Sequence, residues 1–439
     1  MSTCYINEIP PEILAQILQL TDYEALSHSR IFHLASVCKR WKEVVFTSPH
    51  FWTTLECTIS DRLKNGPEST VPALLERFER WFARAGDMPW SLCLSFNTAS
   101  RKTSQLYQYI IGIPRWRSLS FTLNLTGASN WNWFEGLVAA AQASGKANGD
   151  TPCWPQLETL EIEAPGVRYS DGRLALPLQS IAPNLRNLKV TVAELGGPIF
   201  NAFEGFPWTN LVHFEFAGLV GVESLDFYLR LLSQAPNLRT LKALDNQNDF
   251  SAMLPLSSVT VPIPLTHINL RHLALHDSPN VLLFLKSVKL PSLVSIDLSR
   301  AYDPQDIAFP PHSTPISDAI RALVLASNCR IKVLRLKWTP IFEQDLYLLL
   351  TAIPTVEDIE LDETACFLTQ PSVFFERLES TKAPSVLLPN LQRFSFNQGY
   401  RCRLVEVGDA EFETFMERPL VWWKEGLHLG EAETSPPRP

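Results

Sequence analysis

The sequence lacks the features of a membrane protein and of a general polyanion binder. It has no run of about 18 apolar residues, the length that a transmembrane helix needs, and Lys286 and Lys289 interrupt its most apolar stretch. Its 38 Lys and Arg are outnumbered by 46 Asp and Glu, which gives a net charge of -8. Because phosphate neutralisation requires clustered Lys and Arg, we expect neither a nucleic-acid nor a membrane partner.

The sequence also lacks paired cysteines. None of its eight cysteines forms a C-x-x-C motif, so neither a zinc site nor a redox pair is indicated. Such dispersed cysteines are typical of reduced thiols in an intracellular protein. No basic segment followed by an apolar one occurs at the N-terminus, so we expect no secretory leader and a location in the cytoplasm or nucleus.

Motifs of catalysis and of metal binding are missing as well. There is no phosphate-binding loop, no G-x-S-x-G and no H-E-x-x-H. His272 and His276 fall on a predicted strand, where their side chains would be about 13 Å apart, too far to share an ion. We therefore predict a non-catalytic protein without cofactors or metals. An enzyme stays a minor alternative, which would require a deep pocket lined by convergent polar groups.

Two apolar stripes at helical spacing mark the N-terminal segment 9–52. Pro10 and Pro11 stand where the first helix begins, since a first turn tolerates the missing N–H of proline. The first stripe consists of Ile13, Leu14, Ile17 and Leu18, and the second of Ile31, Leu34, Val37, Cys38 and Trp41. So short a segment cannot bury this much apolar surface by itself. The stripes pack on the rest of the chain or face a partner protein.

The order of residues in this segment resembles an F-box. Ile-Pro-Pro-Glu-Ile-Leu at 9–14 is followed by Val-Cys-Lys-Arg-Trp at 37–41, then by Pro49 and the pair Phe51 and Trp52. The spacer at 21–30 is longer than in the commonest F-box pattern; together with WFARAG at 81–86 and RWRSL at 115–119, it resembles F-box proteins of mushroom-forming fungi.

The resemblance implies docking on the Skp adaptor of an SCF-type (cullin–RING) ubiquitin ligase. The adaptor-binding residues that it implies are Pro10, Ile13, Leu14, Ile17, Leu18, Val37, Cys38 and Trp41. The match is a hypothesis until its structural context is known.

Behind this segment, the unit apolar-x-x-apolar-x-apolar recurs at intervals of 23 to 38 residues. It begins at Leu157, Leu185, Leu211, Leu238, Leu270, Leu293, Ile331, Val356 and Leu391. Proline stands two residues before many of these positions, at the start of the predicted strand, where no ladder N–H is needed. Helical stretches separate the units, a pattern typical of leucine-rich repeats. The asparagine usual in such repeats after the strand is missing, so we expect degenerate repeats in an irregular arc.

The predicted fold class is α/β, with a helical F-box domain followed by a solenoid of parallel strands. The alternative is an α/β domain with an open parallel sheet. We predict an F-box-like domain at 1–56, connecting helices and first strands at 57–150, repeats at 151–408, and a capping helix with a disordered tail at 409–439. The Pro-rich stretches 245–264 and 300–315 are interpreted as disordered or surface loops.

Between the core positions of the repeats, acidic and basic residues alternate along the predicted concave face. The target-binding residues predicted there are Glu161, Lys189, Glu215, Lys242, His272, Asp297, Arg335, Glu360 and Arg393. An ordinary solvated sheet face is an equally open interpretation. The leading hypothesis is a non-catalytic substrate receptor of an SCF-type ligase. The alternative is a leucine-rich-repeat scaffold without a ligase role, in which the F-box-like segment only caps the repeats.

Overall fold

The structure is a computed structural model, which contains two compact units, Met1–Leu211 and Val212–Pro439. It describes residues 8–20, 28–59, 70–96, 104–123, 131–147, 149, 151–169, 178–195, 206–219, 224–244, 264–276, 281–299, 315–337, 339, 341–362, 366–367, 388–397, 420–423 and 426–429.

The first unit begins with a group of short helices. These are α1 (Pro11–Leu20), α2 (His28–Val37), α3 (Lys39–Thr47) and the 3-10 helix η2 (Pro49–Trp52). Cys38 separates α2 from α3 because its backbone is extended, with φ of -158° and ψ of 167°, and its Sγ accepts the Trp41 N–H at 3.4 Å. This is an N-cap in which sulfur takes the place of the usual oxygen. The described parts of the segment 9–52 are therefore largely helical, as its two stripes predicted.

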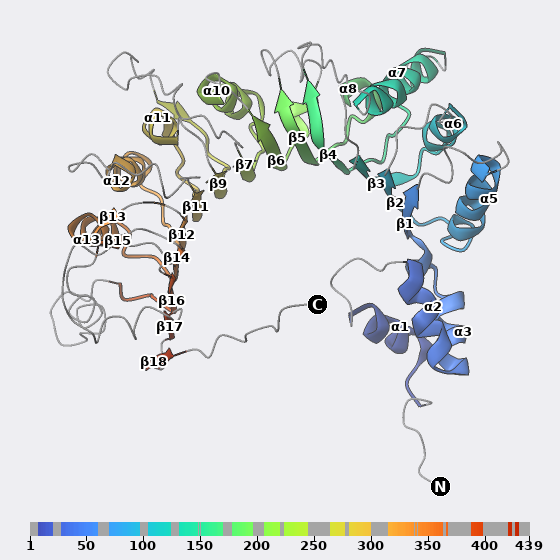
Figure 1. Cartoon of the computed structure of the whole chain (residues 1–439), viewed down its shortest axis with the longest axis horizontal. Coiled ribbons are helices and arrows are strands. Elements are labelled where there is room, and N and C mark those ends of the chain that lie inside the picture. The colour runs from blue at the N-terminus through green and yellow to red at the C-terminus, as the bar shows by residue number, and fades with distance from the viewer. Residues whose placement is uncertain are drawn as a thin grey trace, which may run out of the picture. The chain divides into compact units, whose positions relative to one another are not determined.

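A parallel sheet follows in the same unit. Its strands are β1 (Thr54–Ile59), β2 (Trp90–Phe96), β3 (Trp116–Leu123), β4 (Thr159–Tyr169) and β5 (Asn187–Leu195), each paired with the next. The helices α5 (Thr70–Phe82), α6 (Ser104–Gly112), α7 (Trp131–Ala147) and α8 (Leu178–Ile181) lie on one face (Figure 1). The unit ends in η3 (Trp208–Asn210). One face of the sheet is thus covered and the other is left open.

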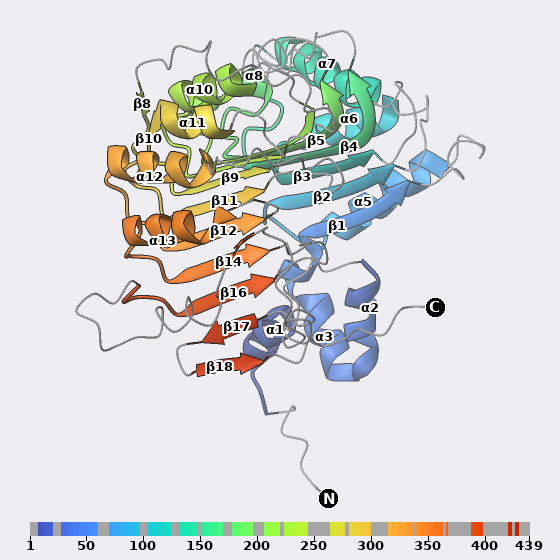
Figure 2. The same cartoon turned by 60° about the vertical axis from the view of Figure 1, so that its left-hand side comes forward.

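The second unit repeats this plan. Its parallel strands are β6 (His213–Leu219), β7 (Thr240–Leu244), β9 (His272–His276), β11 (Ser295–Ser299), β12 (Val333–Lys337), β14 (Asp358–Asp362) and β16 (Arg393–Asn397). The antiparallel strands β17 (Leu420–Trp423) and β18 (Gly426–Leu429) extend the sheet beyond β16. The helices α10 (Ser224–Gln234), α11 (Val281–Ser287), α12 (Pro315–Ser327) and α13 (Glu343–Ala352) lie on one side (Figure 2). Two small parallel pairs join β8 (Leu265–Thr266) to β10 (Val288–Lys289) and β13 (Ile341–Phe342) to β15 (Cys366–Phe367).

The core lies between sheet and helices, and the strand register builds it row by row. In the second unit one apolar row runs across neighbouring strands through Phe214, Leu241, Leu273, Ile296, Leu334, Ile359 and Phe394. All are buried, because alternate residues of a strand point to the same face. In each predicted repeat from 157 to 396, the second and third apolar positions lie in a strand, and the first lies two residues before it. The α/β class is therefore confirmed.

A ladder of asparagine side chains joins successive repeats. The amide Nδ2 groups of Asn184 and Asn210 donate to the carbonyls of Pro155 and Pro183 at 2.8 and 2.7 Å. In the second unit, Asn269 and Asn390 likewise donate to Pro236 and Pro354. The asparagine expected after the strand instead precedes it, directly before the first core residue of the repeat. The recurring proline lies four residues before its strand and supplies the acceptor of this hydrogen bond.

Some elements differ from the sequence-based expectations. The boundary predicted after residue 56 falls within β1, in which Leu55 and Ile59 are buried. The segment 409–439 contains β17 and β18, which were not predicted. The predicted capping helix that follows residue 408, the end of the predicted tail, and nearly all of the loops 245–264 and 300–315 lie outside the described residues.

Candidate functional site

Helix α1 presents an apolar strip to solvent. The side chains of Ile13, Ile17 and Leu20 are 46%, 41% and 70% exposed. Residues spaced by three and four share one side of a helix, so these three form a continuous face. Leu20 lies three residues after Ile17 and so extends the strip. This spacing is visible in the sequence, but Leu20 was not among the adaptor-binding residues that the resemblance implied.

The other half of the α1 stripe points inward. Leu14 and Leu18 are each 1% exposed, since α1 packs against α3. Their side chains therefore cannot touch a partner while the helices stay folded. Both were assigned to adaptor contact from sequence; the structure places them in the interior of the helical group, where they support the exposed strip.

The junction of α2 and α3 adds to the exposed surface. Val37 is 61% exposed, and Cys38 is exposed beside it. The Arg40 guanidinium donates to the Ile9 carbonyl, which brings the start of α1 next to the start of α3. The structure thus brings the exposed Pro10 into the neighbourhood of Val37 and Cys38.

Trp41, the last of the predicted adaptor-binding residues, is half-buried in α3. Its indole Nε1 is buried and has no hydrogen-bond partner among the described residues, and the same holds for Arg40 Nε. A buried donor without an acceptor costs about 1–3 kcal/mol. The junction therefore contains two buried N–H donors that have no acceptor among the described residues.

An aromatic cluster fixes the helical group to the following elements of the first unit. The Trp52 ring lies 5.3 Å from Phe46 and 4.7 Å from Trp81 of α5, and Phe32 contacts the same group. The Arg84 guanidinium stands 4.3 Å over the Trp52 ring, a cation–π contact. The closing residues of the segment are thus interior packing, and the surface left for a partner lies on α1 and at the α2–α3 junction.

The open face of the first unit's sheet carries small hydroxyl groups and a few carboxylates. One row across the strands consists of Glu56, Cys93, Ser120, Glu161 and Lys189. The Ser120 hydroxyl donates to Glu161 Oε2 at 3.2 Å, and Lys189 Nζ lies 2.6 Å from Glu163 Oε1. Burial raises the pKa of the Cys93 thiol, so it stays protonated at neutral pH.

In the second unit, the register brings most of the predicted target-binding residues into one row on the open face. This row contains Glu215, Lys242, Ala274, Asp297, Arg335, Glu360 and Ser395. His272 and Arg393 belong to the neighbouring row. The sequence-based assignment to a common face therefore agrees with the register.

Most of these charges are paired with each other across strands. Lys242 Nζ lies 3.5 Å from Glu215, and Arg335 Nε lies 3.2 Å from Glu360. Opposite charges on neighbouring strands stabilise a sheet. The acidic and basic residues that alternate in the sequence thus neutralise each other on this face, and little net charge is left there for a partner.

The strongest of these pairs joins Arg393 to Asp358. Nε and NH2 of Arg393 donate to the two carboxylate oxygens at 2.7 and 2.8 Å, a bidentate pair. This hydrogen bond to Asp358 raises the pKa of Arg393 above its ordinary value. Asp358 was absent from the predicted residues. Its pairing with Arg393 depends on the register between β14 and β16, which the spacing of the repeats in the sequence does not determine.

Metal binding finds no support in the described part of the chain. No group of three or more His, Cys, Asp or Glu there could hold an ion. His272 is exposed on the strand, and His276 faces Asp297 at the other end of the same strand. No helix in the described ranges is both long and apolar enough to cross a membrane.

A comparison with known protein families identifies the group of N-terminal helices. An F-box-like family model matches residues 6–58, which include α1, α2, α3 and η2. No curated protein matches the chain significantly. The chain thus carries an F-box-like domain, and a long α/β sheet region with parallel strands follows it.

Proposed function

We propose, from the premise that residues 6–58 form an F-box-like domain, that the chain is a non-catalytic substrate receptor of an SCF-type ubiquitin ligase. The domain docks on a Skp-type adaptor, and through it on a cullin–RING ligase. The sheet region behind it, which we interpret as degenerate leucine-rich repeats, binds a target protein. The chain performs no bond chemistry and raises the local concentration of the target near the ligase.

The observation that carries the proposal is the exposed apolar strip of α1. Ile13 and Ile17 are each about half covered by their own domain, so a partner would bury the rest. At about 25 cal/mol per Å² of apolar area, completing that burial contributes roughly 1 kcal/mol per side chain. An amphipathic helix that offers its apolar side to a groove is a recurring mode of protein recognition.

The docking surface proposed here differs from the family-derived set. It consists of Pro10, Ile13, Ile17, Leu20, Val37, Cys38 and Trp41. Leu14 and Leu18 hold α1 against α3 and act only through the position of the strip. Trp41 is half-buried, and only the exposed part of its side chain is available to the adaptor.

The target is proposed to bind to the sheet region, where the predicted residues lie on the open faces of the two units. Extended sheet faces of repeat proteins commonly bind proteins, which is an argument by analogy with the fold. Because Arg335, Glu360 and their neighbours already form pairs, a target would compete with these pairs, and its affinity would depend on geometry more than on net charge.

Co-purification tests the proposal. The tagged chain, expressed in cells, is expected to recover the adaptor and a cullin, whereas Ile13→Asp with Ile17→Asp is expected to recover neither. The matched control is Ile268→Asp with Leu325→Asp, because these apolar side chains are 63% and 74% exposed and lie in the second unit. Unchanged recovery by the α1 variant would refute adaptor docking.

A second candidate function is an interaction scaffold without a ligase role. The packing of Trp52 on Trp81 favours it, because it makes the helical group a cap over the first strand and helix of the sheet region. A cap needs no exposed strip, so the scaffold predicts that the α1 variant and its control behave alike in every binding assay.

A further inference from the structure

The second unit has one concentration of positive charge that its own carboxylates do not neutralise. It consists of Arg239, Arg271, Lys286 and Lys289, here called the basic edge. All four side chains are exposed. Within the described part of the chain, none of them forms an ion pair with a carboxylate. This contrasts with the open face of the same sheet, where the charges are paired.

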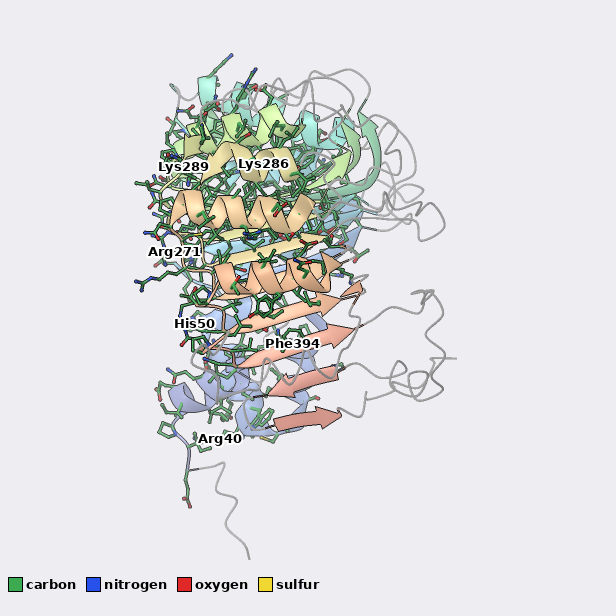
Figure 3. All side chains as sticks on the ribbon, turned by 90° about the vertical axis from the view of Figure 1, so that its left-hand side faces the viewer. Arg40, His50, Arg271, Lys286, Lys289 and Phe394 are labelled. Atoms are coloured by element: carbon green, nitrogen blue, oxygen red, sulfur yellow. The ribbon has the colours of Figure 1, made fainter. Side chains whose placement is uncertain are left out.

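A backbone hydrogen bond places two of these cations, Arg239 and Arg271, side by side. The Arg271 N–H donates to the Arg239 carbonyl at 2.8 Å, so the two arginines occupy the same position on neighbouring strands. Neighbouring strands are about 4.8 Å apart. The His267 N–H donates to the Lys289 carbonyl at 2.9 Å, which joins the segment of Lys289 to a residue four positions before Arg271. Figure 3 shows Arg271 and Lys289 at the edge where the strands begin.

A buried histidine holds this edge together. The His267 ring is 4% exposed; its Nε2 lies 2.9 Å from the Ala235 carbonyl, and its Nδ1 accepts the Leu270 N–H at 3.1 Å. Ala235 leads into Arg239, and Leu270 directly precedes Arg271. The ring therefore fixes the two segments that carry the arginines, and the cations are presented from a rigid base.

In the corresponding row of the first unit, a carboxylate compensates the charges of two arginines. There Glu158 lies between Arg117 and Arg186, since the Glu158 N–H donates to the Arg117 carbonyl and the Arg186 N–H to the Glu158 carbonyl. Arg117 Nε contacts Glu158 Oε2 at 2.9 Å. Like charges on neighbouring strands destabilise a sheet, whereas opposite charges stabilise it. Arg239 and Arg271 lack such an intervening carboxylate, and an external anion would relieve their repulsion.

Helix ends account for only part of the cluster. Lys286 lies in the last turn of α11, where a cation interacts favourably with the helix dipole. Arg239 and Arg271 follow no helix directly; each lies between the first core residue of its repeat and its strand. Neither a helix end nor a carboxylate of the described residues compensates the charges of these two neighbouring arginines. In a chain of net charge -8, they form an unusual local excess of positive charge.

We propose that the basic edge binds an acidic segment of the target protein, rich in Asp and Glu. In an extended peptide, side chains two residues apart share one face at about 6.8 Å, which is within reach of two long arginine side chains that extend from neighbouring strands. Guanidinium groups bind carboxylates in bidentate fashion, which favours Arg239 and Arg271 as the principal contacts. The inference rests on the proposed function only in one respect, that the acidic segment belongs to a target of the ligase. The binding of the acidic segment itself requires no adaptor.

Fluorescence polarisation with a labelled oligoglutamate peptide and the purified full-length chain tests this proposal. The peptide is expected to bind, more weakly as salt is raised, and Arg239→Glu with Arg271→Glu is expected to lower the affinity roughly tenfold or more. The conservative pair Arg239→Lys with Arg271→Lys should keep most of the affinity. The matched control, Lys146→Glu with Arg186→Glu, makes the same charge change in the first unit and should stay within about twofold of wild type.

A second variant, Lys286→Glu with Lys289→Glu, guards against misfolding of the arginine variant and should also weaken binding. Absence of peptide binding, or equal loss in the control pair, would overturn the proposal. Binding of a labelled single-stranded oligonucleotide in preference to the peptide would overturn the partner class. The assay contains no adaptor, so its failure leaves adaptor docking untouched, and failure of adaptor docking leaves this result standing.

Discussion

The indole rings of Trp52 and Trp81 meet nearly edge to face, with centroids 4.7 Å apart and an angle of 66° between the planes. Trp52 ends η2, and Trp81 lies near the end of α5. Trp52 Nε1 donates to the Val45 carbonyl at 2.9 Å, and Trp81 Nε1 donates to Thr54 O at 3.1 Å. Within the first unit, this pair couples the F-box-like helices to the start of the sheet.

Replacing Trp81 with alanine should destabilise the chain by about 3–5 kcal/mol, the usual cost of deleting a buried aromatic side chain. The loss should be seen in denaturant unfolding followed by circular dichroism. Tyr347→Ala is the control, because that aromatic ring is partly exposed on α13 and should cost much less. A Trp81 variant as stable as the control would show that the aromatic cluster is not a structural joint.

His267→Ala should cost roughly 2–4 kcal/mol, because it leaves the Ala235 carbonyl and the Leu270 N–H buried without their partner. His272→Ala, on the exposed side of β9, should leave the unfolding free energy nearly unchanged. Equal effects of the two substitutions, measured by denaturant unfolding, would contradict the role given to the His267 ring.

Stability should fall at alkaline pH through the buried thiol of Cys329. Burial raises its pKa from 9.0 to about 11 in the folded chain. Below pH 9.0 the thiol is protonated in both states; between 9.0 and about 11 only the unfolded state loses the proton, so folding is disfavoured. The expected slope is up to about 1.4 kcal/mol per pH unit. In Cys329→Ala, this contribution to the pH dependence of the unfolding free energy should vanish. An unchanged pH dependence would mean that other groups cause it.

Thiol alkylation should report adaptor binding. Cys38 is exposed at the proposed docking surface, whereas Cys153 and Cys329 are buried, and burial raises the pKa of both. Because the thiolate is the reactive form, Cys38 should react with iodoacetamide before these two. Saturating adaptor should slow the reaction of Cys38 and leave Cys57 unaffected, as measured by mass spectrometry. Equal protection of both cysteines would point to a global change instead.

The sequence was sufficient for the strands of the repeats because two periodic signals coincide. Alternating apolar residues such as Leu241 and Ala243 mark the face, and a preceding proline such as Pro236 marks the start. Strand β1 was missed because Glu56, Cys57 and Thr58 interrupt the simple alternation between Leu55 and Ile59. The resemblance to fungal F-box proteins stays a prediction.

The candidate site was less predictable, because periodicity assigns residues to one side of an element but does not say what covers that side. Ile13, Leu14, Ile17 and Leu18 form one stripe, and only the position of α3 determines that the two leucines are inside. Likewise, the pairing of Arg393 with Asp358 depends on strand register. The basic edge was invisible for the same reason, since Arg239 and Arg271 are distant in sequence and meet only through the register.

Titration calorimetry of the purified chain with a purified Skp-type adaptor tests the central claim most directly. Ile13→Asp with Ile17→Asp should lower the affinity by roughly a hundredfold or more, because it removes apolar burial and places two charges in the interface. Ile268→Asp with Leu325→Asp should bind as wild type does. If the α1 variant is folded and binds the adaptor as tightly as wild type, the account of the exposed strip is contradicted.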